Sequence, residues 1–478
     1  MPRNVTAHLL SSEFSVDGLR VIGLTGTEAI SRLYAFDVDV VAERPNAPFA
    51  LQLLGSQVLI VFTASGSVER VLAGIVAQAS DGLDVASQLR TYRLRVVPRA
   101  YRLTQLTYSE KFSGPLESMM SKKLTLCDIP LESRLGIKYV DEPTSFRAQF
   151  AESDFEFISR RCEHYGVSYF FTMSRDGERM VFTDVGHFID RRKELHIPFR
   201  SRGERTDIHA LVADAQMTPS LRMVADYNYR QPELECVGRA VLEGGTGGGV
   251  IEYGVNVKSP GDAATLARVR AEEHDSRRLV FKGESDRSEL CAGLRFTLDG
   301  HPYLGDLELL VTEVEHVIEQ PSRNSERGAL AYSNRFKAVP ASVNYRPPRV
   351  TKRPRVPGVM SGIVLAPPEG PATKPWLDDQ GRYRVQLTSE VFQTTPCEQK
   401  AGSMRMVQAS AGPGYGVHFP LRPGTEVMLA FVNGDPDRPI ILGAVPNEVT
   451  PSPVRGDEPL HHRITTAAGI LMEFEDGD

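Results

Sequence analysis

Short segments in which apolar and polar residues alternate constrain the fold of this chain more than any other feature. The clearest of them lie at 34–41, 89–97 and 382–387. A period of two places alternate side chains on opposite faces of a strand, so these segments predict half-solvated antiparallel sheet. Two apolar runs, Val58–Phe62 and Val71–Val76, are further strand candidates. We therefore expect a mainly β protein with a few helices.

The helix predicted over residues 154–165 is the best defined of three. Ser153 is expected to be its N-cap, and Glu156 three residues later completes a capping box. Gly166 is typical of the residue at which a helix ends. The expected apolar stripe comprises Phe155, Ile158, Cys162 and Tyr165. The two other helices are predicted from Pro115 to about Leu126 and from Ser259-Pro260 to Arg278.

Length and composition limit the class of protein. A chain of 478 residues corresponds to three or four domains. The amino terminus has no charged segment followed by an apolar one, so we expect no cleaved secretory signal. No apolar run approaches the roughly 20 residues of a membrane-spanning helix. Five scattered cysteines without a CxxC pair favour a reducing folding compartment.

A segment rich in proline and arginine, 346–357, interrupts the strand pattern. Five of its residues are basic and none is acidic. The density of prolines predicts an extended, semi-rigid linker. Two interpretations of the charges stay open: a solvated strap, or a strap that docks on an acidic groove of a neighbouring chain.

Residues 358–446 predict a compact all-β unit. Glu426–Val432 and Ile440–Val445 flank the stiff loop Asn433–Pro439, and together they form a strong hairpin signal. About five short strands in this length suit a small barrel, a fold that often binds oligonucleotides. However, seven basic and eight acidic residues lie between 360 and 446. This balance offers no basic stripe for phosphates, so we expect no nucleic-acid partner.

No sequence motif indicates a catalytic, cofactor or metal site. Gly244–Gly249 does not match a dinucleotide-binding pattern and is interpreted as a flexible loop. His461-His462 lacks further ligands at a usual spacing, and Glu272–Asp275 is interpreted as the charged face of a polar helix. A Ser-His-Asp triad assembled in space stays open.

The last strand-like segment is 464–474. One face of it carries Ile464, Ile470, Met472 and Phe474. A lone strand leaves its backbone donors and acceptors unpaired, whereas three copies around an axis can pair them and bury the apolar face. We predict the first strand of an intertwined three-chain β-prism with these four residues in its core. Asp476-Gly477 is a turn signal, so we expect the natural chain to continue beyond 478.

Several groups of residues share their order and spacing with one known family. In the first three quarters of the chain they are Asp154–Arg160, Gly166–Phe171, Gly293–Leu298, His301-Pro302 and Val311–His316. The most specific ones lie in the predicted barrel: Gly381–Gln386, Ala411–Gly416, Pro423–Val427 and Gly434–Gly443. On these residues, nearly the whole chain resembles VgrG, the spike protein of type VI secretion systems, and its relatives in phage tails and extracellular contractile injection systems.

The resemblance implies a mechanical function without a cofactor. Such proteins are homotrimers that cap a hexameric, Hcp-like tube and puncture the target membrane while they carry effectors. Baseplate components and a PAAR-repeat tip protein are further implied partners. The implied location is cytoplasmic during assembly, and later outside the cell or inside the target cell. We expect no intrinsic catalysis; the alternatives are a spike-borne effector enzyme and a cell-wall-binding module.

The resemblance also divides the chain. The expected parts are a first tube-type β domain (1–105), a helix-containing α+β domain (106–204), a second tube-type domain with a helical insertion (205–345), the linker (346–357), an OB-fold barrel (358–446), and a neck with the first strand of a triple-stranded β-helix (447–478). The expected structural motif of the barrel comprises Gly381, Arg382, Gly412, Gly414, Gly416, Gly424, Gly434, Asp435, Pro436, Asp437, Arg438 and Pro439.

Overall fold

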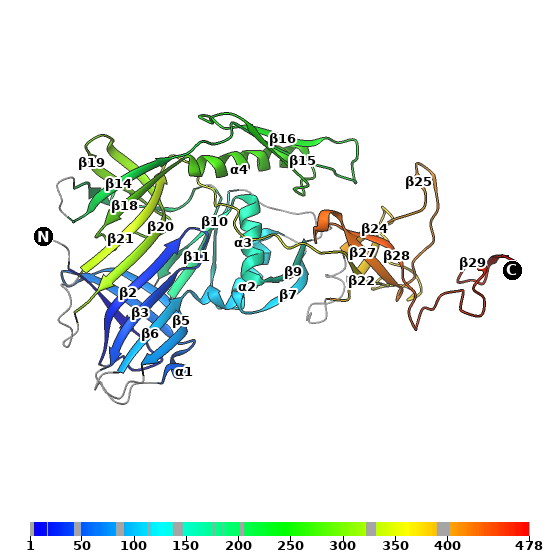
Figure 1. Cartoon of the computed structure of the whole chain (residues 1–478), viewed down its shortest axis with the longest axis horizontal. Coiled ribbons are helices and arrows are strands. Elements are labelled where there is room, and N and C mark those ends of the chain that lie inside the picture. Colours follow the sequence, from blue (N-terminus) through cyan, green and yellow to red (C-terminus); the bar gives the residue numbers. More distant parts are fainter. Residues whose placement is uncertain are drawn as a thin grey trace. The chain divides into compact units, whose positions relative to one another are not determined.

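The computed structural model describes residues 4–16, 18–42, 49–82, 90–112, 115–136, 147–174, 177–184, 186–200, 205–321, 331–389 and 402–477 (Figure 1). The chain forms two compact units. The large unit comprises Met1–Leu106, Met120–Lys138 and Ser153–Lys352, and the barrel unit comprises Thr107–Met119, Tyr139–Glu152 and Arg353–Asp478. Strands dominate both units, as the alternating segments predict.

Thirteen of the described strands form one sheet in the large unit. Ten of them follow one path: β1 (Val5–Leu10), β4 (Gln57–Ala64), β5 (Ser67–Gly82), β6 (Arg90–Val97), β3 (Ala35–Ala42), β2 (Leu19–Ala29), β20 (Gly305–Glu319), β21 (Ala331–Pro340), β18 (Leu279–Ser285) and β14 (Ile208–Ala215). The other three are β19 (Leu294–His301), which pairs with β20, and the short strands β12 (Ile189–Asp190) and β13 (His196–Pro198), which pair with β19.

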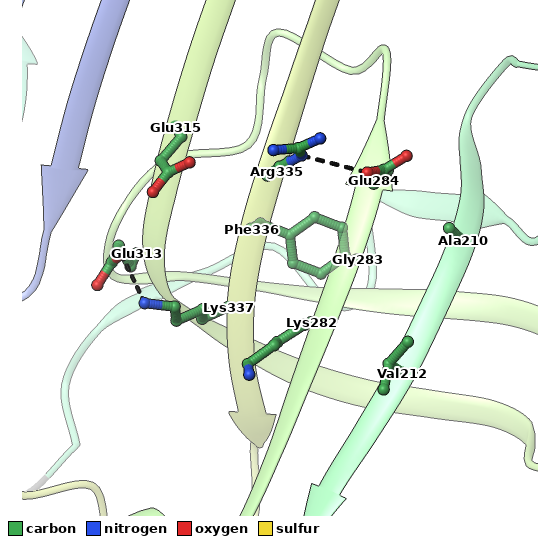
Figure 2. A pocket seen from close by; sticks show the side chains of 10 residues that line it. All are labelled: Ala210, Val212, Lys282, Gly283, Glu284, Glu313, Glu315, Arg335, Phe336 and Lys337. Atoms are coloured by element: carbon green, nitrogen blue, oxygen red, sulfur yellow. Dashed lines mark hydrogen bonds and ion pairs between the residues drawn. The ribbon is translucent and has the colours of Figure 1, made fainter.

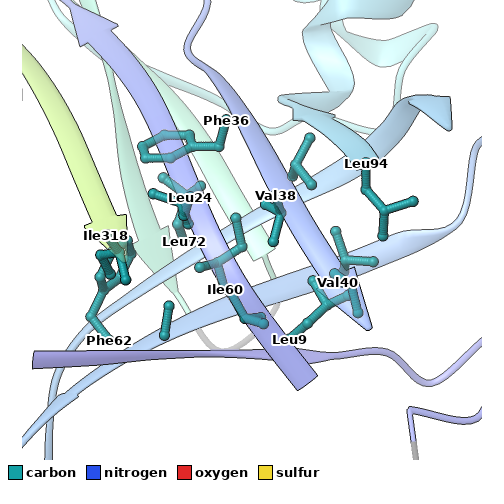
Figure 3. Packing of buried hydrophobic residues seen from close by; sticks show 14 of the residues in the cluster. Leu9, Leu24, Phe36, Val38, Val40, Ile60, Phe62, Leu72, Leu94 and Ile318 are labelled. Atoms are coloured by element: carbon teal, nitrogen blue, oxygen red, sulfur yellow. The ribbon is translucent and has the colours of Figure 1, made fainter. Parts of the chain in front are cut away.

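The predicted alternation is confirmed in β3, where Phe36 and Val38 are fully buried. On the opposite face of the same strand, Asp39 lies 2.7 Å from Arg93 of β6. Figure 3 shows the core that results, in which Phe36, Val38 and Leu94 pack with residues of five other strands, β1, β2, β4, β5 and β20. Each strand thus contributes apolar side chains to one shared core.

One strand pairing joins segments from the two ends of the large unit. β2 pairs with β20 in antiparallel register, from Gly23 opposite Glu319 to Ala29 opposite Glu313. Strands from residues 5–97 and strands from residues 189–340 therefore share a continuous sheet. Ile318 of β20 is part of the core that β3 and β6 also line.

Helix α3 (Asp154–Tyr165) begins and ends where the sequence predicts. Ser153 Oγ accepts the N–H of Glu156, the Glu156 carboxylate accepts the N–H of Ser153, and Gly166 ends the helix with φ of 70°. Ile158 and Cys162 of the predicted apolar stripe are fully buried, but Phe155 and Tyr165 are only half-buried, whereas Phe157, outside the stripe, is fully buried. The helix is buried on more sides than a single stripe requires.

Helix α4 (Pro260–Arg278) packs against a three-stranded sheet with the order β16 (Cys236–Val241), β15 (Leu221–Asp226) and β17 (Gly249–Tyr253), as Figure 1 shows. Ser259 is its N-cap, as predicted. A Cβ on Gly238 would lie 2.1 Å from the backbone of Ala263, so β16 touches the helix backbone. Gly244–Gly249 forms the connection from β16 to β17.

The remaining elements of the chain before residue 200 are short. They are α1 (Ala50–Leu53), η1 (Arg99–Thr104), β7 (Thr107–Phe112), α2 (Leu116–Thr125), β8 (Leu131–Arg134), β9 (Arg147–Ser153), β10 (Ser168–Ser174) and β11 (Gly177–Thr183). β10, β11 and β8 form a small sheet, and β7 pairs with β9. The helix predicted from Pro115 is confirmed as α2.

Five strands close into a barrel in the barrel unit, in the order β22 (Val359–Val364), β23 (Tyr383–Leu387), β24 (Gly402–Met406), β28 (Pro439–Ala444) and β27 (Glu426–Phe431). The barrel core contains the fully buried side chains of Tyr383, Val385 and Leu429. The predicted hairpin is confirmed, since β27 and β28 pair on either side of η2 (Val432–Gly434). Two hairpins complete the unit: β25 (Ala411–Gly412) with β26 (Tyr415–Gly416), and β29 (His461–Thr465) with β30 (Leu471–Glu475).

Candidate functional site

The residues singled out by the sequence lie at three places: the strap along α4, the barrel loops and the tail hairpin. Within the described ranges, no group of three His, Cys, Asp or Glu side chains could hold a metal ion. None of the helices in that part of the chain has the length and apolarity needed to cross a membrane.

The first arginine of the strap is anchored inside the large unit. Arg346 Nε lies 2.7 Å from a carboxylate oxygen of Glu272, and the Arg346 backbone N–H donates to Ser276 Oγ at 2.9 Å. The same guanidinium donates to the backbone carbonyl of Gly166 at 3.0 Å and to that of Asp184. Arg346 therefore joins α4 to the end of α3.

A network of charges, the strap network, surrounds the middle of α4. Arg349 lies 2.7 Å from Glu252 and 3.1 Å from Glu273, and both glutamates also contact Arg270, whose side chain is fully buried. Arg222 Nη2 lies 3.7 Å from Glu252, and Arg277 Nη2 lies 2.6 Å from Glu273. Four guanidinium groups thus share two carboxylates.

Burial and surplus positive charge set the pKa values in the strap network. Burial, and then the positive charge of Arg349, lower the pKa of Arg270 to about 10. Burial alone would raise the pKa of Glu252, but the charges of Arg270 and Arg349 outweigh it and hold that pKa below its ordinary value. The network therefore favours the charged form of Glu252 and disfavours the charged form of Arg270.

These contacts correct two interpretations of the sequence. The solvated-strap interpretation is wrong for Arg346, which is buried, and the acidic groove that receives the strap belongs to the same chain. Glu272–Asp275 is indeed charged, but Glu273 and Arg270 are buried rather than solvated. The sequence could not supply this result, because the partners lie about 70 to 100 residues apart along the chain.

The loop between β27 and β28 is fixed by its two aspartates. Asp435 Oδ2 lies 2.7 Å from Arg353 Nη2, and the N–H of Arg438 donates to the Asp435 carbonyl at 2.9 Å. Asp437 Oδ1 accepts the N–H of Ala148 at 2.7 Å. Gly434 has φ of 69°, a conformation that other residues adopt at a cost. This part of the predicted motif therefore consists of residues that shape a turn.

The other predicted motif residues of the barrel also lie in turns. Arg382 Nε lies 2.7 Å from Asp378 Oδ2, within the turn that precedes β23. The glycines with left-handed φ among them are Gly381, Gly414, Gly416 and Gly424. Gly412 pairs with Tyr415 in the β25–β26 hairpin. Pro436 lies in the loop between β27 and β28, and Pro439 is the first residue of β28. None of these positions presents a reactive group to a ligand.

The tail differs from its prediction. Residues 464–474 do not form one continuous strand, because Gly469, with φ of 86°, lies in a turn that reverses the chain. β29 and β30 instead pair with each other, with Ile464 opposite Met472. The four predicted core residues, which include Ile470 and Phe474, are all exposed in the single chain. Their place in a trimer core remains a prediction.

A groove of about 250 Å³ crosses β14, β18, β21 and β20 (Figure 2). Figure 2 shows two cross-strand ion pairs in it, Arg335 with Glu284 at 3.2 Å and Lys337 with Glu313 at 2.8 Å. Because neighbouring charges neutralise each other, the groove concentrates no charge for a ligand. We interpret it as the solvent face of the sheet.

A second network, the core network, is buried in the main sheet and was not predicted from the sequence. Glu28 Oε1 lies 2.8 Å from His316 Nε2, and Glu28 Oε2 lies 2.8 Å from Arg70 Nη2. His316 Nδ1 lies 2.8 Å from the Tyr332 hydroxyl. Burial would raise the pKa of Glu28, but Arg70 and then His316 outweigh it and lower that pKa to about 2. Glu28 and His316 come together only when β2 and β20 pair, in a register that sets Glu28 opposite Val314 and His316 opposite Gly26.

Two family models match this chain. Residues 27–322 match the phage tail baseplate hub (GPD) model, and residues 373–445 match the type VI secretion system/phage-baseplate injector OB domain. The chain belongs to the phage tail baseplate hub family. The resemblance to VgrG and the expected mainly β fold with an OB-fold barrel are thereby confirmed.

Curated relatives extend these matches over nearly the whole chain. The type VI secretion system spike protein VgrG4b of Pseudomonas aeruginosa is 27% identical over 487 residues, which cover 95% of this chain and 57% of that protein. VgrG3 of Vibrio cholerae is 26% identical, with 91% and 44% covered. The actin cross-linking toxin VgrG1 of V. cholerae is 27% identical, with 91% and 41% covered. The chain spans about half the length of these relatives.

Solved structures show the same fold. A component of the E. coli type VI secretion system, described as structurally similar to the T4 bacteriophage tail proteins gp27 and gp5, has a TM-score of 0.67 and 20% identity, with 92% of this chain and 100% of that chain covered. VgrG in the Francisella PdpA-VgrG complex has a TM-score of 0.62 and 9% identity, with 99% and 83% covered. At these identities the likeness concerns the fold alone.

Proposed function

We propose that this chain is the hub and spike subunit of a contractile injection machine of the type VI class. In this role, three copies cap a hexameric tube, puncture the target membrane and carry effectors. The observation that carries the proposal is the order of the two family matches, a baseplate hub over 27–322 and an injector OB domain over 373–445, in one chain. Relatives that match on both sides of the strap are described as spike proteins.

The proposed domain plan uses two tube-type segments, 1–105 and 205–345, flanking the α+β segment 106–204. Three chains would then present six similar positions to a six-fold ring. The pairing of β2 with β20 supports this plan, because it holds the two tube-type segments in one sheet. The OB-fold barrel, 358–446, and the neck, 447–478, would follow the linker.

The proposed partners are an Hcp-like tube protein, baseplate components, a PAAR-repeat tip protein and effectors. The Francisella relative is a VgrG in complex with PdpA, which supports a role in holding other proteins. We further propose assembly in the cytoplasm, followed by secretion or injection, with transient contact with the target membrane.

The mass of the purified full chain in solution tests the proposal. Light scattering should give three times the chain mass of 52.8 kDa, and negative-stain images should show an elongated particle with a broad end. A deletion that ends the chain at Glu458 should lower the melting temperature of the trimer or dissociate it if the tail hairpin contributes to the core. A well-folded monomer or dimer at micromolar concentration would contradict the proposal.

We also propose that residues 1–478 act without catalysis. The relatives described as spike proteins support this proposal, whereas the actin cross-linking toxin VgrG1 shows that a relative can be a toxin. Muramidase, peptidase, lipase and nuclease assays on the full chain should show no turnover. A turnover that a single point substitution abolishes would contradict it.

A further inference from the structure

The sheet formed by β16, β15 and β17 has two unlike faces. The side chains of Arg222, Val224 and Asp226 point to the α4 side and are buried. The register places nine residues on the opposite face in three rows. These rows are Val241–Leu221–Gly249, Arg239–Met223–Ile251 and Val237–Ala225–Tyr253. We call these nine residues the open face.

The open face is apolar and exposed. Val241, Ile251 and Tyr253 expose 75%, 66% and 65% of their surface. Scattered exposed apolar residues are normal on a protein, but contiguous apolar patches mark interaction surfaces. Here the apolar residues are contiguous, because each row joins partners on three hydrogen-bonded strands.

Arg239 is the only charged residue of the open face. It lies in the middle row, beside Met223, and its side chain is exposed. Among the residues that the structure describes, none forms an ion pair with it. A partner that covered this face would therefore have to offer Arg239 a carboxylate, since burying an unpaired guanidinium is unfavourable.

We propose that the open face docks a partner protein through an amphipathic segment that presents apolar side chains and one carboxylate to Arg239. Self-packing of two open faces around a two-fold axis fits less well, because it would bury two arginines and no carboxylate. The proposal goes beyond the hub and spike function, and it requires that the open face stays uncovered in the trimer.

A random peptide library displayed on phage and selected on the immobilised full chain tests the proposal. Selection should enrich peptides that combine several apolar residues with one Asp or Glu. A synthesised winner should bind Ile251→Asp at least tenfold more weakly than the unmodified chain, as measured by fluorescence anisotropy. The matched control is Val68→Asp on β5, which changes an apolar residue that is 62% exposed and should not alter binding.

Reversing the charge of Arg239 tests directly whether it selects an acidic residue in the partner. Selection on Arg239→Glu should replace the acidic residue of the enriched peptides by Lys or Arg, while circular dichroism confirms that the variant is folded. Three outcomes would overturn the proposal: winners without an acidic residue, winners that bind Ile251→Asp and Val68→Asp equally, or hydrogen exchange that shows the open face already covered by another copy of this chain.

Discussion

The core network is buried and the strap network only partly so, and their charge balances differ. In the core network, one carboxylate, Glu28, meets one guanidinium, Arg70, and a histidine whose pKa burial holds below its usual value. In the strap network, four arginines share Glu252 and Glu273, and Arg270 Nη1 is buried without a hydrogen-bond partner. Only the core network therefore depends on a single carboxylate.

The largest effect should follow the loss of that carboxylate. Glu28→Ala leaves Arg70 buried without a counter-charge and removes a hydrogen-bond partner of His316, which we expect to cost about 3–5 kcal/mol of unfolding free energy. Urea denaturation followed by circular dichroism measures it. Glu315→Ala, an exposed glutamate on the same sheet, is the control and should change stability by less than about 0.5 kcal/mol. Equal effects of the two substitutions would remove the contrast between the networks.

Acid should weaken the core network in two steps. The folded protein keeps the pKa of His316 below 6.5 and that of Glu28 at about 2, so the unfolded chain binds more protons in acid and stability falls with pH. The loss begins below about pH 6.5 for His316 and continues from about pH 4.5 towards 2 for Glu28, up to about 3 kcal/mol. Denaturation at a series of pH values checks this. Glu28→Ala should remove the lower step and enlarge the upper one, because Glu28 partly offsets the effect of burial on the pKa of His316.

A smaller effect should come from the end of α3, where the strap is anchored. A Cβ at Gly166 would lie 2.5 Å from Val269 Cγ1 and 3.0 Å from Arg346 Cδ, at φ of 70°. We expect Gly166→Ala to cost about 2 kcal/mol, of which about 1 is the backbone conformation. Gly305→Ala has a similar φ of 66° and open space around its Cβ, so thermal unfolding should show about half that loss. Equal losses of stability for Gly166→Ala and Gly305→Ala would mean that Val269 and Arg346 move aside without cost.

The smallest loss of stability should come from replacing Arg349 in the strap network, where arginines outnumber glutamates. Arg349→Met removes one of the four cations and leaves Arg222, Arg270 and Arg277 with the two glutamates, so we expect a loss of about 1 kcal/mol or less. The pKa of Arg270 should rise, because the positive charge of Arg349 lowers it. Denaturation measures the stability, with Lys352→Met, an exposed position of the same segment, as control. A loss as large as that of Glu28→Ala would show that the strap network has no surplus.

Local signals were predicted from the sequence and long-range partners were not. Ser153, Glu156 and Gly166 act within one helix, so their spacing alone fixed the ends of α3. The predicted stripe contained Phe155 instead of the fully buried Phe157, because neighbouring elements bury α3 on several sides. For the candidate sites, residue types predicted the turns of the barrel, but nothing in the sequence places Arg349 beside Glu252.

The tail shows how a period can mislead. Alternation continues through 464–474, and a hairpin with a tight turn keeps the same alternation on both of its strands. Gly469 was the available signal, because glycine at the centre of an alternating run often marks a turn. The barrel hairpin was predicted correctly because its loop, Asn433–Pro439, contains two prolines and a glycine that no strand tolerates together.

The pairing of β2 with β20 also has a consequence for synthesis of the chain. Gly23 and its partner Glu319 are 296 residues apart in the sequence. The edge of β2 that pairs with β20 therefore has no partner strand when β2 leaves the ribosome. At about 5–20 residues per second, this edge waits roughly 15–60 s before β20 is translated. During that interval β2 presents an open row of backbone groups, to which a second nascent chain or a chaperone can bind. The pairing of β2 with β20 can therefore form only late in translation.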